Sequence, residues 1–287
     1  MALIDIDGIS VAYGQPSRPV LSQVSLQIHE GEFVCVLGQT GCGKSTLLRL
    51  VLGSERPADG RITIDGQEHH RPDRTRGYVP QKYSLFPDRT VLDNISFGCE
   101  LVEFNLATRF SPRFYRRRRE IRASAMDCLL RTGLSESDAL KYPDQLSGGM
   151  QQRVAIAQAL MTRPRILLMD EAFSALDPAT RADMQGWIRE LWRETGTTIL
   201  FVTHNTHEAL SLGTRVIVLA KDAPGQGSRV RLDLSVPSPC RDEDSSRLVR
   251  CLEGASRNQL PASDYSDLSE AISMEKRYFT SDLSNRS

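Results

Sequence analysis

Short apolar runs alternate along the chain with longer segments of helical periodicity. Continuous apolar runs rich in β-branched residues are typical of strands buried on both faces, as in the parallel sheets of α/β proteins. The predicted strands are Phe33–Leu37, Ile62–Ile64, Ile166–Met169, Thr198–Val202 and Arg215–Leu219. Helices are predicted at Lys44–Val51, Gly149–Met161, Pro178–Glu194 and Thr206–Leu212. This alternation predicts an α/β layered fold.

Two regions interrupt the alternation. Residues 88–145 lack strong strand patterns, and the amphipathic segment Ala125–Leu134 indicates a helix, so we expect a helical insertion there. From about Pro237 the chain is rich in Ser, Asp, Glu and Arg. Within this region, the spacing of Tyr265, Leu268 and Ile272 indicates a short amphipathic helix. This composition favours a poorly ordered or surface-bound tail, with a regulatory role as the alternative.

Composition narrows the class of protein. The 287 residues carry 36 Lys and Arg against 36 Asp and Glu, and this balance argues against a strongly basic nucleic-acid binder. No apolar run approaches the ~18 residues that a membrane span needs, and the N-terminus lacks a signal-peptide pattern, so we expect a cytosolic chain. The six cysteines lack the spacing of a metal site, and we expect reduced thiols.

A glycine-rich motif comes directly after the first predicted buried strand. Gly38–Ser45 reads GQTGCGKS, matches G-x-x-x-x-G-K-[ST] and opens a predicted helix, the context that a phosphate-binding loop requires. Glycines let successive backbone N–H groups turn toward phosphate oxygens, and the helix N-terminus adds partial positive charge. Lys44 supplies a cation for the β- and γ-phosphates, and the Ser45 hydroxyl can ligate Mg²⁺. The predicted ATP-binding segment comprises Gly38, Gln39, Thr40, Gly41, Cys42, Gly43, Lys44, Ser45 and Thr46.

Cys42 lies inside this loop and has two interpretations. It is a small packing residue, or it is a thiol whose alkylation blocks nucleotide entry.

Two acids end another buried strand. Ile166–Glu171 reads ILLMDE, and a buried strand rarely carries carboxylates unless they face a site. Asp170 is the candidate Mg²⁺ ligand. Glu171 is the candidate catalytic residue that polarises the attacking water, a role worth about 10²–10⁴-fold in rate. Positioning and charge neutralisation supply most of the remaining acceleration in phosphoryl transfer.

A third motif begins a helix. Leu146–Met150 reads LSGGM and runs into QQRVAIAQAL, so Ser147, Gly148 and Gly149 form a second anion-binding helix N-terminus. The phosphate loop followed by LSGGM makes the chain resemble the ATP-binding-cassette (ABC) family, over about residues 2–220. The signature of that family is LSGGQ, and Met150 stands here in place of its last residue.

The resemblance implies a fold and a domain organisation. The expected fold is a P-loop NTPase cassette with a RecA-like core, an antiparallel β edge subdomain and a helical signature subdomain at about residues 88–160. Residues 1–236 would form the ATPase domain, and residues 237–287 a polar C-terminal tail, partly disordered.

The resemblance also implies roles for single residues. Tyr13 matches the aromatic residue that stacks on adenine, and His204 matches the histidine that contacts the γ-phosphate. Gln81 matches the glutamine that touches Mg²⁺ and the attacking water, and Ser174–Asp177 matches the loop that signals between two ATP sites. The two acids after the strand match the Mg²⁺ aspartate and the catalytic glutamate.

Two phosphate-binding helix starts in one chain imply a second copy. The resemblance places ATP between the phosphate loop of one chain and Ser147–Gly149 of another, so that hydrolysis opens the dimer. It implies membrane permease subunits as partners, a periplasmic solute-binding protein as an indirect partner, and no nucleic acid. The expected location is the cytoplasmic face of the inner membrane, as a peripheral subunit.

The solute class leaves alternatives. The segments YPDQLSGGMQQRVAIAQAL and THEALSLGTRVIVL are similar to the nitrate/sulfonate/taurine importer group, whereas ILLMDEAFSALDP is closer to the glycine betaine/proline group. Outside transport, a soluble cassette acting on ribosomes or DNA, a nucleotide-dependent module without turnover and a simple kinase are the other hypotheses. A cassette acting on ribosomes or DNA usually has tandem cassettes or a long coiled coil, and the sequence shows neither. Intact Glu171 and His204 argue against a module without turnover. The LSGGM motif is not expected in a kinase.

One segment is longer than the resemblance leads us to expect. Leu101–Arg122 contains the run Arg116–Arg119, which is either a solvated helix face or a surface near anionic lipid headgroups.

Overall fold

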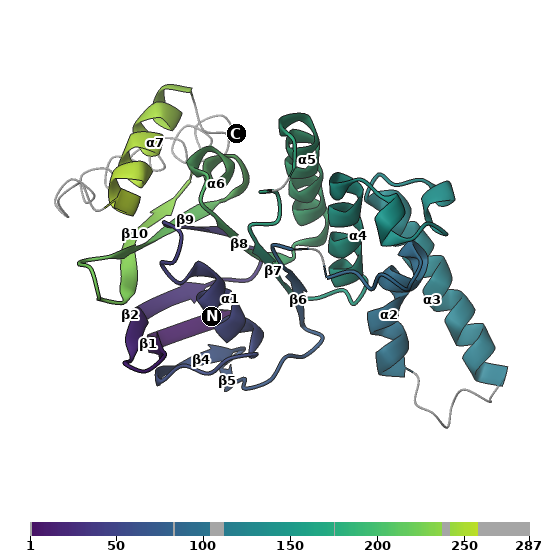
Figure 1. The fold of residues 1–287 in the computed structure, drawn as a ribbon, viewed down its shortest axis with the longest axis horizontal. Coiled ribbons are helices and arrows are strands. Elements are labelled where there is room, and N and C mark those ends of the chain that lie inside the picture. The colour runs from purple at the N-terminus through teal and green to yellow at the C-terminus, as the bar shows by residue number, and fades with distance from the viewer. Residues whose placement is uncertain (1, 83, 104–111, 175, 237–241, 258–287) are drawn as a thin grey trace, which may run out of the picture. The chain divides into compact units, whose positions relative to one another are not determined.

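The computed structural model describes the chain apart from residues 1, 83, 104–111, 175, 237–241 and 258–287 (Figure 1). The fold divides into two units. Unit 1 comprises Met1–His70 and Phe201–Ser287, and unit 2 comprises Arg71–Leu200. The predicted boundary between an ATPase domain and a tail at residue 236 stays a prediction.

Unit 1 is built on strands of mixed direction. They are β1 (Ile4–Tyr13), β2 (Arg18–Ile28), β3 (Phe33–Leu37), β4 (Asp59–Ile64), β5 (Gln67–Glu68), β9 (Arg215–Lys221) and β10 (Ser228–Ser235), and they lie in the order β5-β4-β1-β2-β10-β9-β3. The pairs β1/β2, β1/β4, β4/β5 and β9/β10 are antiparallel, whereas β3 pairs in parallel with β9. The expected antiparallel β region is therefore present beside a buried parallel pair.

The parallel pair forms the centre of unit 1. All of β3 is buried, and β9 is buried from Val216 to Ala220, as their continuous apolar sequences predict. Strand β8 (Thr198–Thr203) is also fully buried, and it spans the point in the chain where the two units divide. Phe33 and Phe201, both in unit 1, pack edge to face with ring centroids 6.4 Å apart. This core supports the loop after β3.

The strands that sequence analysis missed have mixed burial. Strands β1, β2 and β10 alternate between buried and exposed positions, and none forms a continuous apolar run. In unit 2, β6 (Arg76–Val79) was missed because it is short and begins with Arg76 and Gly77. Half-buried strands give a weaker sequence pattern than strands covered on both faces.

The helices of unit 1 are α1 (Lys44–Leu52), α6 (Thr206–Leu212) and α7 (Asp242–Arg257). Helix α7 lies in the region expected to be a polar tail, and sequence analysis predicted no helix at these residues. Leu248, Cys251, Leu252 and Ala255 are buried at spacings i, i+3, i+4 and i+7, and α7 contacts α6, β9 and β10. Cys and Ala in this stripe make the helical pattern inconspicuous. The helix hinted at by Tyr265, Leu268 and Ile272 lies outside the described residues.

Unit 2 combines a parallel strand pair with the predicted helical region. Its elements, besides β6, are α2 (Val91–Glu103), α3 (Pro112–Arg131), η2 (Glu136–Asp138), η3 (Pro143–Gln145), α4 (Gly148–Leu160), β7 (Ile166–Asp170) and α5 (Pro178–Thr195). Strands β6 and β7 pair in parallel, with Val79 opposite Met169. Helices α2, α3 and α4 pack around a shared apolar cluster that includes Ile95, Leu129 and Val154. The predicted helical insertion is confirmed.

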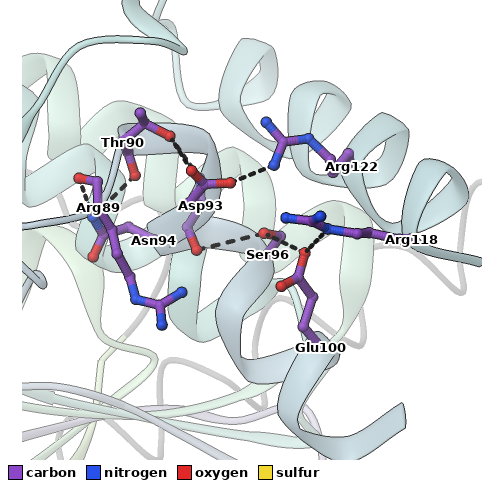
Figure 2. A network of polar contacts seen from close by, with 8 residues as sticks. All are labelled: Arg89, Thr90, Asp93, Asn94, Ser96, Glu100, Arg118 and Arg122. Carbon is purple, nitrogen blue, oxygen red and sulfur yellow. Dashed lines mark hydrogen bonds and ion pairs between the residues drawn. The ribbon is translucent and has the colours of Figure 1, made fainter. Parts of the chain in front are cut away.

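Asn94 is fully buried and its side chain hydrogen-bonds to the loop that leads into α2. Figure 2 shows this network of contacts. The Asn94 amide nitrogen donates to the carbonyl oxygens of Phe86, Arg89 and Thr90 at 3.0–3.1 Å, and its oxygen accepts from Phe86 N at 2.8 Å. The Arg89 guanidinium lies 4.2 Å from the centroid of the Phe97 ring. The turn before α2 therefore has backbone groups that are hydrogen-bonded to the Asn94 side chain.

No helix within the described ranges is long and apolar enough to cross a membrane. The five cysteines that the structure describes are free thiols, and Cys240 lies outside the described residues.

Candidate functional site

A glycine-rich turn connects β3 to α1 in unit 1. Gly43 is the N-cap of α1 with a φ of 96°, and no side chain caps this helix start. A Cβ atom at Gly43 would lie 2.7 Å from Leu21 Cδ2, and one at Gly38 would lie 2.5 Å from Leu219 O. Gly43 must therefore be glycine because its backbone has a positive φ, and Gly38 must be glycine because a side chain would not fit there. The result is a turn that ends in a helix N-terminus, which suits an anion.

Lys44 places a positive charge in this turn. Its side chain is almost fully buried, and Nζ donates to Gly38 O at 2.8 Å and to Gln39 O at 3.2 Å. Two backbone carbonyls thus hold the ammonium group within the loop. A cation in a partly desolvated site attracts an anion more strongly than one in water. The loop, the helix start and the ammonium group together fit a phosphate.

The other residues of the loop take different environments. Cys42 is 4% exposed, and burial raises the pKa of its thiol, so the structure favours the packing interpretation over that of a reactive thiol. Thr46 is buried, and its hydroxyl accepts from Arg49 Nη2 at 3.2 Å. Gln39 and Thr40 are exposed. The side chains at the tip of the loop therefore face solvent, while those at its base pack inward.

Tyr13, the predicted adenine-stacking residue, ends β1. Its hydroxyl donates to Glu55 Oε2, and Arg49 Nε donates to the other oxygen of Glu55 at 2.6 Å. The Tyr13 side chain is nevertheless 43% exposed, so ring surface is accessible for stacking. Glu55 orients this ring, and sequence analysis missed it because no motif connects it to Tyr13.

The two predicted acidic residues lie at the end of β7 in unit 2. Strand β7 is fully buried, and Asp170 at its end is 5% exposed. Glu171 has a φ of 45°, an uncommon conformation for a residue with a side chain that is often found at functional sites. Gln81 Nε2 donates to Glu171 Oε2 at 3.1 Å. The structure therefore brings together two candidate residues that are 90 positions apart in the sequence.

The LSGGM motif begins α4 as predicted. Ser147 is the N-cap, and its hydroxyl accepts from Met150 N at 3.3 Å. Gly148 and Gly149 form the first turn. A Cβ atom at Gly149 would lie 2.7 Å from Thr180 Cγ2 on α5, so this glycine allows two helices to approach closely. Thr180 is a second neighbour of the site that sequence analysis missed.

The Ser174–Asp177 loop precedes α5, and its Ala175 lies outside the described residues. Asp177 is the N-cap of α5 and accepts from Thr180 N at 3.1 Å. This hydrogen bonding holds the pKa of the Asp177 carboxyl below its usual range.

His204 comes directly after β8 in unit 1 and is exposed. Polar contacts fix the residues on both sides of it. The Thr203 hydroxyl donates to buried Glu208 and accepts from Asn205 N at 3.0 Å. Asn205 Oδ1 accepts from Glu208 N at 3.1 Å and caps α6. The backbone at His204 is therefore well anchored.

The predicted site residues divide between the two units. Unit 1 carries Tyr13, the loop from Gly38 to Thr46, and His204, whereas unit 2 carries Gln81, Ser147, Gly148, Gly149, Asp170 and Glu171. Within unit 2, Gln81 and Glu171 meet, while Ser147 lies on a different element, at the start of α4.

The ABC transporter family matches residues 21–174 of the chain. The chain is 43% identical over 225 residues to the taurine import ATP-binding protein of Ruegeria pomeroyi, covering 77% of this chain and 78% of that protein. It is 39% identical over 218 residues to the nitrate import ATP-binding protein of Synechococcus elongatus, with coverage of 75% and 76%. It is 44% identical over 208 residues to the spermidine/putrescine import ATP-binding protein of Marinobacter nauticus, covering 70% of this chain and 52% of that protein.

Solved structures show the same fold. A dimeric ATP-binding cassette in a post-hydrolysis state, bound to ADP and Pi, has a TM-score of 0.68 and 31% sequence identity, covering 82% of this chain and 99% of that one. A cassette from the CbiONQ transporter complex of Clostridium perfringens has a TM-score of 0.68 and 27% identity, covering 87% of this chain and 95% of that one.

Proposed function

The chain belongs to the ABC transporter family as an ATP-hydrolysing importer subunit, and we propose that it powers uptake of a small anionic or zwitterionic solute through separate permease subunits. The observation that carries the catalytic part of this proposal is the contact of Gln81 with Glu171, directly after buried Asp170.

ATP binding rests on the phosphate loop. The turn at Gly38–Gly43 leaves no room for side chains at two positions, and Lys44 contributes a buried ammonium group. Backbone N–H groups at the start of α1 bind the phosphate oxygens, and Lys44 neutralises their charge. The exposed ring of Tyr13, whose hydroxyl is held by Glu55, stacks on adenine.

Mg²⁺ is the cation that we propose for the nucleotide site. The resemblance assigns it to Ser45, Gln81 and Asp170, which offer hydroxyl, amide and carboxylate oxygens, the ligands that Mg²⁺ prefers. When bound, Mg²⁺ neutralises phosphate charge as it develops during hydrolysis.

Hydrolysis is assigned to three side chains. The Glu171 carboxylate accepts a proton from the attacking water, and the Gln81 amide holds that carboxylate in position. His204 contacts the γ-phosphate and orients it for in-line attack. The anchored backbone on both sides of His204 supports this positioning role.

A second copy of the chain completes the nucleotide site. The proposal is that Ser147, Gly148 and Gly149 of one copy bind the γ-phosphate held by the phosphate loop of the other. A related cassette has been solved as a dimer bound to ADP and Pi, and this supports the arrangement. A ligand shared by two chains favours the closed dimer, and its hydrolysis favours opening.

The solute is proposed from the relatives. Taurine, nitrate and bicarbonate importers are 37–45% identical to the chain and aligned over 75–85% of it. The spermidine/putrescine relatives are similarly identical, but the chain spans only 52–54% of their length. We therefore favour a solute of the nitrate, sulfonate or taurine type over a polyamine, with a glycine betaine or proline type as the alternative. The subunit would act at the cytoplasmic face of the inner membrane, with a periplasmic solute-binding protein as an indirect partner.

Two variants test the ATPase assignment. Glu171→Gln is expected to bind ATP, to lower the phosphate-release rate about 100-fold or more and to trap a nucleotide-bound dimer in light scattering. Lys44→Ala is expected to weaken ATP binding about 100-fold, because it removes the charge-assisted contacts. Normal turnover by the first variant or normal affinity of the second would contradict these assignments.

Uptake measurements test the solute. In the cell that produces this protein, we replace the gene with its Lys44→Ala form and measure uptake of labelled taurine, nitrate, bicarbonate and putrescine. Loss of taurine or nitrate uptake alone supports the proposal, whereas loss of putrescine uptake alone contradicts it.

A further inference from the structure

The α2–α3 hairpin ends in a group of exposed apolar side chains. Helices α2 and α3 lie side by side, and the end of α2 and the start of α3 lie at the same end of the pair (Figure 1). At that end Leu101, Val102 and Tyr115 are 62%, 53% and 71% exposed. Exposed large apolar side chains that gather at one place commonly mark an interaction surface. We call this end of the hairpin the tip.

Ion pairs join the two helices of the hairpin, at the tip and behind it. Three arginines of α3 contact acids of α2 (Figure 2 shows two of the pairs): Arg122 with Asp93, Arg118 with Glu100 at 3.5 Å, and Arg117 with Glu103 at 2.6 Å. The contact with Arg117 holds the pKa of the Glu103 carboxyl below its usual range. These arginines are therefore engaged within the hairpin, and they fix α2 against α3.

Two arginines next to Tyr115 are not engaged in this way. The Arg116 side chain is 79% exposed, and Glu120, at 3.9 Å, is at the limit of an ion pair. Arg119 is exposed and makes no ion pair or hydrogen bond with any residue that the structure describes. The tip thus combines three apolar side chains with two exposed arginines, of which Arg116 has Glu120 as a distant partner.

We propose that the tip docks on the headgroup layer of a membrane that contains anionic lipids. An amphipathic tyrosine and short aliphatic side chains suit the boundary between headgroups and acyl chains. Arginine lays its apolar stem along such a surface and donates bidentate hydrogen bonds to lipid phosphate. Arg119, which has no ion-pair partner among the described residues, leaves a positive charge that favours an anionic surface over a neutral one.

The proposal is independent of the nucleotide chemistry, so its failure is distinguishable from failure of the proposed function. The experiment is co-sedimentation of the full chain, without nucleotide, with vesicles of phosphatidylcholine alone or with about one-third phosphatidylglycerol. We expect binding to the anionic vesicles that weakens as salt rises, and much weaker binding to the neutral ones.

Matched variants locate the contact. Arg119→Gln and Arg116→Gln are each expected to weaken binding to the anionic vesicles about fivefold, and Leu101→Gln to weaken it further by a similar factor. The controls are Arg131→Gln and Leu130→Gln, which remove an exposed arginine and an exposed leucine from the opposite end of α3. Both controls should bind like the unchanged chain.

Three results of the vesicle experiments alone would overturn the proposal. They are no binding to anionic vesicles, equal binding to neutral vesicles, and equal losses from the tip variants and the controls. Tip variants that bind vesicles normally but lose the co-purifying permease would instead identify the tip as a protein contact, and this outcome also overturns it. Phosphate release by Arg119→Gln should match the unchanged chain, because Arg119 is not part of the nucleotide site.

Discussion

Helices α1 and α4 both begin in glycine-rich sequences proposed to bind phosphate, yet their first turns are built differently. Gly43, which has a positive φ, precedes α1, and no side chain caps that helix. Ser147 precedes α4 in an extended conformation, and its hydroxyl accepts from Met150 N. The glycines also differ, because Gly43 is required by its backbone conformation whereas Gly149 makes room for Thr180.

The two helix starts thus show two different ways in which a protein can form an anion-binding site. The start of α1 is shaped by the backbone, and the adjacent Lys44 adds a full charge. The start of α4 is shaped by packing against α5, and a neutral hydroxyl supplies its cap. We therefore expect α1 to contribute most of the ATP affinity and α4 to contribute mainly to pairing of two copies.

Among the variants at these two helix starts, Gly43→Ala should have the largest effect on stability. Alanine at a φ of 96° is strained, and its Cβ would also contact Leu21, so the free energy of unfolding should fall by about 2 kcal/mol. ATP affinity, measured with a fluorescent analogue, should fall at least about tenfold, because the loop can no longer close around phosphate. The control is Gly186→Ala in α5, where a Cβ meets open space and should stabilise the helix by up to about 1 kcal/mol. Unchanged ATP affinity in Gly43→Ala would break the comparison.

Gly149→Ala should have the next largest effect on stability, and a second substitution should restore the lost stability. The added Cβ would lie 2.7 Å from Thr180 Cγ2, so we expect a loss of about 1–2 kcal/mol in urea unfolding. Thr180→Ser removes the atom in contact, so the double variant should recover the lost stability. No comparable rescue is expected for Gly43→Ala combined with Leu21→Ala, since the backbone strain persists. Failure of the Thr180→Ser rescue would show that packing is not the reason for Gly149.

Ser147→Ala should cost about 1 kcal/mol of stability, the usual value for a lost N-cap. In the Glu171→Gln background it should also weaken the ATP-dependent dimer several-fold in light scattering, with ATP binding by the monomer unchanged. Ser147→Thr keeps the hydroxyl and should restore both properties. A Ser147→Ala protein that loses monomer ATP affinity instead would contradict the division of roles between α1 and α4.

The smallest expected effect on stability comes from η2, where Ser135 and Asp138 form a capping box. Hydrogen bonds from Lys141 and Ser135 lower the pKa of Asp138 to about 2. A carboxyl with a pKa below its unfolded value stabilises the fold above about pH 4, and this contribution is lost as the pH falls toward 2. Because Lys141 is partly exposed, we expect about 0.5–1 kcal/mol in urea unfolding between about pH 5 and 2.5. Asp138→Asn should remove this part of the pH dependence, and an unchanged profile would contradict it.

Much of the candidate site could be predicted from local sequence. The loop after β3, the acids that end β7 and the serine that begins α4 each depend on a few consecutive residues. A continuous apolar run marks a strand covered on both faces, and a glycine or an N-cap residue marks the turn or helix start next to it. The half-buried strands β1, β2 and β10 and the helix α7 carried weaker patterns, because only one face of each meets the core.

The sequence by itself determined which residues carry the phosphate and water chemistry, since each motif acts through its own backbone. Only the tertiary structure decided which distant residues hold them: Gln81 against Glu171, Glu55 against Tyr13, and Thr180 behind Gly149. It also decided which arginines of α3 are paired with α2 and which remain exposed at the tip. The physical reason is that these contacts depend on how separate elements pack, and no short stretch of sequence encodes that packing.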